Sequence, residues 1–208
     1  MNSSNKFKFV WWATAGCASR ATSQFFTSMG VDDLYNHAEG FVHGQGGSFT
    51  HKHGFPEGKE DWSVVCNLRN PYSLIVSGYL DIKVDKSNLE FSDYVKNDYF
   101  SESSLERTDP FFLNAWKNFH KGADYLIRME SMEEDLRKLP FFDVDEERWT
   151  NSLYSVRENF YMNESPYDVY EGKFQKYKKY YTQEIADVVY YHMKPYFDLG
   201  GYDRDSWK

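Results

Sequence analysis

The sequence has few cysteines and no long apolar run. Cys17 and Cys66 are its two cysteines, too few for a disulfide framework, and Cys66 lies in an apolar stretch where a reduced thiol packs as a small hydrophobic group. A reducing, cytoplasmic location is therefore expected. No window approaches the roughly 18 apolar residues of a membrane span, and MNSSNKFKFVWW lacks a signal-peptide core, so no membrane partner is expected.

Basic residues are also in deficit. The chain carries 24 Lys and Arg against 32 Asp and Glu, a formal charge of -8. A general nucleic-acid binder needs the opposite balance to displace counterions from phosphates, so no nucleic-acid partner is expected. A small anionic ligand could still be held by a local basic site.

Aromatic residues are abundant, with 17 Tyr and 17 Phe among 208 residues, so rings should dominate the core. The length suits one α/β domain over 1–208. Apolar runs predict buried strands over 7–12, 62–68 and 123–129, and a short strand near 48–51 within a region of loops. Apolar spacing and start signals predict helices over 17–30, 71–80, 89–97, 110–120, 130–139 and 182–193.

The ends of several helices carry specific signals. Gly30 predicts a left-handed C-cap, and Pro140 and Pro195 are expected to lie just beyond helix ends. Strands that alternate with helices indicate an α/β fold, here a three-layer sandwich with a central parallel sheet flanked by helices on both faces.

The stretch CNLRNPYSLIVSGYL, residues 66–80, joins a buried strand to a helix through polar residues. Asn70 is a favoured N-cap and Pro71 a favoured first helical residue, so the helix start is well defined. Arg69 falls at the sheet edge where ligands of open parallel sheets gather. Arg69 and Ser77 could converge across the turn on one anion, and a phosphate would suit both.

The string LRNPYSLIVSGY closely resembles the 3′-phosphate-binding segment of the sulfotransferases, written R-N-P-Y-x-x-x-x-S-x-Y. The matching residues are Arg69, Asn70, Pro71, Tyr72, Ser77 and Tyr79. The resemblance implies that Arg69 and Ser77 hold the 3′-phosphate of 3′-phosphoadenosine 5′-phosphosulfate (PAPS). It also implies the P-loop NTPase-like sulfotransferase fold.

The segment WWATAGCASRATSQFF occupies the place of the family's 5′-phosphosulfate loop, between the first strand and its helix. Small residues there let backbone N–H groups close around an oxyanion at a helix N-terminus. The resemblance assigns this role to Thr14, Ala15, Gly16, Cys17, Ala18, Ser19 and Arg20.

This loop departs from the family pattern because the usual lysine is missing. No lysine occurs between Lys8 and Lys52, and the lysine position falls on Thr14 or Gly16, depending on the register. Arg20 or Lys52 could supply the positive charge, and the spacing does not choose between them. The departure puts turnover in doubt more than nucleotide binding.

The segment FTHKHGFPEG resembles the family's Thr-His-x-Pro-like segment, whose histidine takes the acceptor proton. His51 is the better positional match and His53 the alternative, and an imidazole titrates in the right range for such a base. A zinc site built from His37, His43, His51 and His53 is a rival interpretation, although no Cys or carboxylate spacing completes it.

The later part of the chain resembles the family more weakly. YLIRMESMEEDLRKL is similar to a strand-to-helix segment of the Arg-x-Glu-x-Leu-x-x-Asp type, for which a structural role is expected. The stretch before the Tyr-Tyr-Thr sequence helps to close over the nucleotide in relatives. It makes Asn163, Ser165, Lys173 and Lys176 second-rank candidates for nucleotide binding.

The resemblance implies in-line transfer of a sulfuryl group from PAPS to a hydroxyl or amine of a small-molecule or carbohydrate acceptor. The product nucleotide is 3′-phosphoadenosine 5′-phosphate (PAP), and no metal is required. A PAPS- or PAP-binding protein without turnover is the alternative. A P-loop-related kinase is disfavoured because the chain lacks G-x-x-x-x-G-K-[ST]. The acceptor and the oligomeric state stay open.

Overall fold

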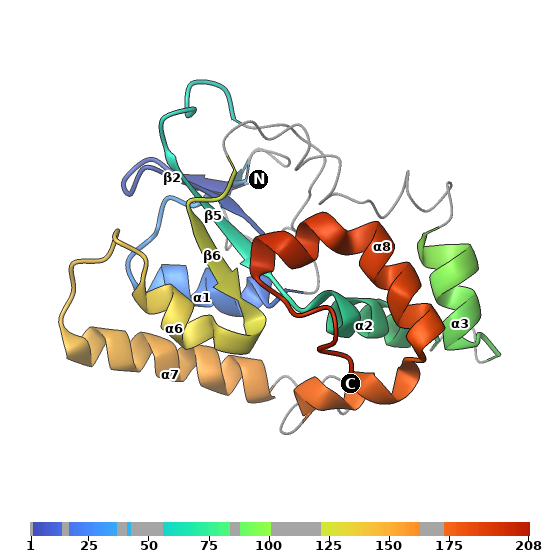
Figure 1. The fold of residues 1–208 in the computed structure, drawn as a ribbon. Coiled ribbons are helices and arrows are strands. Elements are labelled where there is room, and N and C mark those ends of the chain that lie inside the picture. The colour runs from blue at the N-terminus through green and yellow to red at the C-terminus, as the bar shows by residue number, and fades with distance from the viewer. Residues whose placement is uncertain are drawn as a thin grey trace. The chain divides into compact units, whose positions relative to one another are not determined.

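The computed structural model describes residues 2–13, 17–36, 41–42, 56–83, 88–100, 122–162 and 173–208 (Figure 1). The chain divides into two compact units. Unit 1 comprises Met1–Leu68 and Phe119–Asn163, and unit 2 comprises Arg69–Asn118 and Glu164–Lys208. The single domain over 1–208 stays a prediction. The expected helix over 110–120 and strand over 48–51 lie outside the described residues.

Unit 1 is built on a mixed sheet. Among the described residues its strand order is β4-β3-β1-β2-β5-β6. The strands are β1 (Asn2–Ser4), β2 (Phe9–Trp12), β3 (Tyr35–Asn36), β4 (Phe41–Val42), β5 (Ser63–Leu68) and β6 (Tyr125–Arg128). β2, β5 and β6 are parallel, with Trp11 opposite Val65 and Val65 opposite Tyr125. The pairs β1–β2, β1–β3 and β3–β4 are antiparallel.

The predicted α/β class is confirmed, but the prediction of a central parallel sheet holds only for β2, β5 and β6. β1 escaped prediction because its sequence, Asn-Ser-Ser, has neither β-branched residues nor apolar alternation. A turn returns the chain from β1 to β2, with Lys8 in the left-handed region at φ 51°. Ser4, the last residue of β1, accepts from Phe7 N of this turn at 3.2 Å and donates to Asp33 Oδ1, beyond α1, at 2.5 Å.

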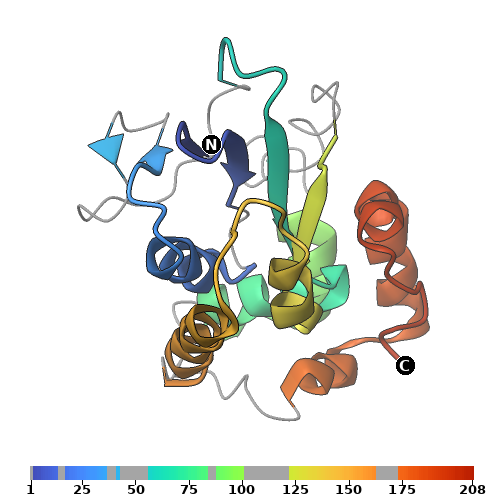
Figure 2. The same cartoon turned by 90° about the vertical axis from the view of Figure 1, so that its left-hand side faces the viewer.

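Helices of unit 1 pack against one face of this sheet. They are α1 (Ser19–Ser28), the 3-10 helix η2 (Met129–Ser131), α6 (Met132–Arg137) and α7 (Glu146–Met162). Figure 2 shows α1 beside α7. The core joins strand residues such as Trp11 and Val65 to Phe26 of α1 and Trp149 of α7. The Trp11 and Phe26 rings meet edge to face at 5.2 Å, so aromatic packing does dominate this core.

Two helix ends in unit 1 follow from local chemistry. Gly30 has φ 88° and follows α1, and Val31 N donates to Phe26 O at 2.9 Å, so the predicted left-handed C-cap is confirmed. α7 was not predicted. Its signal is Asp145, whose carboxylate accepts from Arg148 N at 2.8 Å and caps the helix N-terminus.

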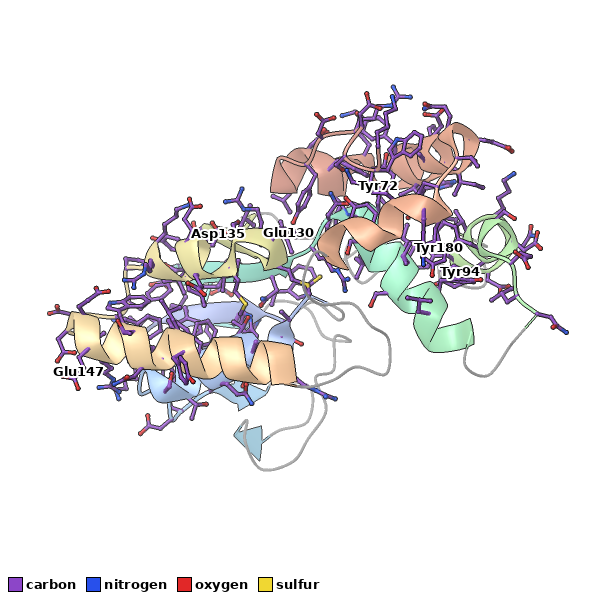
Figure 3. All side chains as sticks on the ribbon, turned by 90° about the horizontal axis from the view of Figure 1, so that it is seen from below. Tyr72, Tyr94, Glu130, Asp135, Glu147 and Tyr180 are labelled. Atoms are coloured by element: carbon purple, nitrogen blue, oxygen red, sulfur yellow. The ribbon has the colours of Figure 1, made fainter. Side chains whose placement is uncertain are left out.

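Unit 2 is helical in the part that the structure describes. Its helices are α2 (Pro71–Lys83), α3 (Phe91–Asp93), the π-helix η1 (Tyr94–Tyr99), the 3-10 helix η3 (Lys173–Tyr180) and α8 (Gln183–Gly200). Tyr79 of α2 contacts the rings of Phe91, Tyr94 and Tyr180 at 5.2, 5.5 and 5.8 Å. Figure 3 shows Tyr94 and Tyr180 close together beside α2.

The predicted end of the last helix was wrong. α8 continues through Pro195 to Gly200, although proline inside a helix removes a hydrogen bond and costs about 3 kcal/mol. Tyr196 and Phe197, which follow the proline, are each 1% exposed. Burial of these two rings offsets the local penalty, and Gly201 at φ 66° ends the helix.

Candidate functional site

The first candidate segment follows β2 in unit 1. Thr14, Ala15 and Gly16 lie outside the described residues. Cys17 is buried, Ser19 is half-buried at the start of α1, and Arg20 is exposed. Ala18 adopts φ 58° and offers no side chain to cap α1, and its carbonyl accepts from Thr22 N at 3.0 Å. The first turn of α1 carries no acidic residue, which suits an anion at this helix N-terminus.

A buried amide ties this segment to the neighbouring strand. Asn67 of β5 donates from Nδ2 to Cys17 O at 3.1 Å and to Thr22 Oγ1 at 2.8 Å. Its Oδ1 accepts from Trp11 Nε1 at 2.6 Å. Sequence reasoning missed Asn67, and the signal that could have found it is a polar amide inside the apolar run VVCNL. Asn67 therefore holds the backbone just before α1 in place.

The second candidate segment is the turn that opens unit 2. α2 begins at Pro71, as predicted. Asn70 Oδ1 accepts from Tyr72 N at 3.0 Å, and Asn70 O accepts from Leu74 N at 2.9 Å, so Asn70 is the predicted N-cap. The first turn of α2 contains no acidic residue. The helix N-terminus next to Arg69 is thus electropositive.

Arg69 is held from two sides at this turn. It is 4% exposed, and its Nε donates to Ser73 Oγ at 2.9 Å. Its backbone N–H donates to Tyr196 Oη of α8 at 3.2 Å. Ser77, one helical turn beyond Ser73, is half-buried on α2. The convergence of Arg69 and Ser77 on one anion stays a prediction.

Tyr72 of the same motif has a packing role. It is fully buried, and its ring contacts those of Tyr181 and Phe197 at 4.9 and 5.0 Å. Its hydroxyl donates to Arg204 O at 2.7 Å. Burial raises the pKa of the Tyr72 phenol well above its usual range, so the group stays protonated and acts as a donor.

The segment 203–207 lies against the start of α2. Asn70 Nδ2 donates to Ser206 Oγ at 2.9 Å, and Tyr177 Oη donates to Ser206 O at 2.9 Å. Arg204 pairs with Asp187 of α8 at 2.7 Å. These contacts immobilise the Asn70 cap, and with it the backbone that carries Arg69.

Several predicted residues cannot be placed. His51, Lys52, His53, Asn163 and Ser165 lie outside the described residues, as do all four histidines of the zinc alternative. Lys173 begins η3, and Lys176 lies within it, but the structure describes only their backbone. The assignments to these residues stay predictions.

A third strand-to-helix turn holds a buried carboxylate. Asp135 of α6 is 3% exposed and accepts from Arg128 Nε at 2.9 Å, Arg128 Nη2 at 2.7 Å and Arg128 N at 3.0 Å. Ser131 and Lys138 also donate to it. Burial raises the pKa of the Asp135 carboxyl, but these hydrogen bonds outweigh burial, and the net pKa is lowered. The arrangement fits the structural role expected for this segment.

We expect Asp135→Asn to destabilise the protein by about 2 kcal/mol at neutral pH, because the Arg128 guanidinium loses its buried partner. The folded-state pKa lies below the unfolded value of 3.8. The stabilisation is therefore present above that value and lost as the pH falls through the folded pKa. Urea unfolding of both proteins from about pH 2.5 to 7 should show the wild-type advantage shrinking on acidification.

Glu134→Gln on the same helix is the matched control. Glu134 also bonds Lys138, but its side chain is 68% exposed. Exposed pairs contribute little, so its effect should stay small at every pH. A wild-type advantage over Asp135→Asn that is constant from acid to neutral pH would show that ionisation of Asp135 does not stabilise the fold.

Comparisons with known proteins leave the family open. No family model matches the chain, and no solved structure matches it. An uncharacterised protein from Archaeoglobus fulgidus is 32% identical over 84 residues. The match covers 38% of this chain and 66%, slightly less than two thirds, of that relative. Within the described residues, none of the helices has the length and apolar character to cross a bilayer.

Proposed function

We propose that this protein is a PAPS-dependent sulfotransferase. It moves the sulfuryl group of PAPS onto a hydroxyl of an acceptor, a carbohydrate or another small molecule, and releases PAP. The observation that carries the proposal is the Arg69 turn. A buried, oriented guanidinium stands at the start of a capped helix without acidic residues in its first turn.

The physical chemistry of this turn suits a phosphate. Guanidinium groups form strong, directional hydrogen bonds to phosphate oxygens, and a helix N-terminus adds a favourable dipole. The start of α1, led by Ala18, is suited in the same way to the sulfated end of the nucleotide. The P-loop NTPase-like topology, with helices in layers on both faces of the sheet, is part of the proposal.

The reaction is an in-line displacement at sulfur. The bond between sulfur and the oxygen of the 5′-phosphate breaks as the bond to the acceptor oxygen forms, and PAP leaves. His51 or His53 takes the acceptor proton. Loop amides over 14–19, with Arg20 or Lys52, stabilise the charge on the peripheral oxygens. The reaction needs no metal.

A nucleotide-binding protein without turnover is the second candidate. The absence of any lysine between Lys8 and Lys52 favours it, because the family uses a lysine at the transferring group. A kinase of related topology is disfavoured by the missing G-x-x-x-x-G-K-[ST].

Calorimetry with PAP, 5′-AMP and ATP separates these functions. We expect PAP to bind at least about tenfold more tightly than 5′-AMP, because only PAP has a 3′-phosphate for Arg69. Single-turnover mixing with labelled PAPS and a panel of carbohydrate and phenolic acceptors then tests transfer. Binding without transfer to any acceptor would favour the second candidate. No preference for PAP, together with tight binding of ATP and Mg²⁺, would favour the kinase.

A further inference from the structure

Ser73 stands one helical turn after Arg69 and directly contacts its side chain. Its hydroxyl oxygen lies 2.9 Å from Arg69 Nε, and both residues are buried, at 3% and 4% exposure. Ser73 falls on the first variable position of the R-N-P-Y-x-x-x-x-S-x-Y pattern, so the pattern does not specify a residue there. The contact joins two residues of α2 and its entry turn, so it lies within unit 2.

The contact restricts how Arg69 can bind an anion. A guanidinium presents donors in a rigid planar fork, with Nε and one Nη on its side edge and both Nη groups at its end. Ser73 takes Nε, so a phosphate on Arg69 must be bound through the Nη groups. The contact with Ser73 therefore restricts the direction of the fork.

The backbone of Arg69 is fixed independently. Tyr196 Oη accepts from the Arg69 N–H at 3.2 Å, and Asn70 caps the helix that follows. With the backbone and Nε both held, the flexible arginine side chain is ordered before a ligand arrives. Ordering in advance removes an entropic penalty from binding.

We propose that Ser73 is a positioning residue for 3′-phosphate recognition. It acts through Arg69 and does not itself touch the nucleotide. The inference rests on the proposed function, since it concerns the phosphate that distinguishes PAP from 5′-AMP. The quantity that reports it is the ratio of the two affinities, which a general loss of stability would not change.

The test measures dissociation constants for PAP and 5′-AMP by calorimetry. Ser73→Ala should weaken PAP binding about tenfold and change 5′-AMP binding less than about twofold. Ser73→Thr, which keeps the hydroxyl, should restore the preference. Ser73→Cys keeps the packing but is a weak acceptor, so it gives the same result as alanine and replaces it if alanine prevents folding.

Ser152→Ala is the matched control, because Ser152 is 2% exposed but lies on α7 in unit 1. It should leave both dissociation constants unchanged. If wild type prefers PAP and the Ser73 variants keep that preference, or lose both affinities equally, the positioning role is wrong and the proposed function stands. If wild type itself shows no preference for PAP, both are overturned.

Discussion

Arg69→Ala should weaken the binding of PAP by about a hundredfold, because the ligand loses a charge-assisted, bidentate contact to its 3′-phosphate. Binding of 5′-AMP, which lacks that phosphate, should change little. The buried guanidinium bonded to Ser73 is the feature that makes the effect large, since an ordered arginine binds without first paying for its own immobilisation. Calorimetry at fixed ionic strength measures both constants.

Arg69→Lys and Arg137→Ala sharpen the test. Lysine keeps the charge but cannot reproduce the fork, so it should recover only part of the affinity. Arg137 lies on α6 in unit 1, pairs with Glu146 and is 41% exposed, so its removal changes the net charge by the same amount at a surface position outside the Arg69 motif. Equal losses of PAP affinity in Arg69→Ala and Arg137→Ala would show that the loss reflects the change in net charge and not a contact between Arg69 and the phosphate. An unchanged PAP affinity in Arg69→Ala would refute the anchor role.

Elements governed by local chemistry were predictable from the sequence. Asn70 and Pro71 set the start of α2, Gly30 ends α1, and the apolar runs that became β2, β5 and β6 were found within a few residues. In each case neighbours along the chain determine the conformation.

Features that depend on distant residues were not predictable. The bond from Asn70 to Ser206 joins residues 136 apart, and that from Arg69 N to Tyr196 joins residues 127 apart. Helix α8 passes through Pro195 because of rings buried beyond it. The Ser73 contact is local, but no pattern indicates that a serine in the first helical turn will accept from an arginine.

The loop before α1 shows how this chain could bind an anion without the missing lysine. The Cys17 carbonyl is already occupied by Asn67, and Ala18 is in the left-handed region, so backbone geometry rather than a side chain shapes this end of the candidate site. Backbone N–H groups can bind a sulfuryl or phosphate oxygen without a lysine. Backbone N–H groups carry no full positive charge, however, and so cannot replace the lysine that relatives use at the transferring group. We therefore expect nucleotide binding to be retained more easily than turnover.

Asn67→Leu should destabilise the protein by about 3 kcal/mol, because it removes three buried hydrogen bonds, those to the Trp11 indole, the Cys17 carbonyl and the Thr22 hydroxyl. Leucine has the same branching and the same four side-chain heavy atoms as asparagine, so the substitution leaves no cavity, although leucine is the larger side chain. Urea unfolding followed by far-UV circular dichroism measures the change.

Asn151→Leu is the matched substitution, at an exposed position of α7 where the effect should stay within about 0.5 kcal/mol. The folded Asn67→Leu protein should also bind PAP and 5′-AMP with equally reduced affinity. The reason is that Asn67 orders the loop expected to hold the 5′ end, which both ligands share. A stable variant with unchanged affinities would show that the amide network neither supports the fold nor shapes the loop. Loss of PAP affinity alone would show that Asn67 affects recognition of the 3′-phosphate and not of the shared 5′ end.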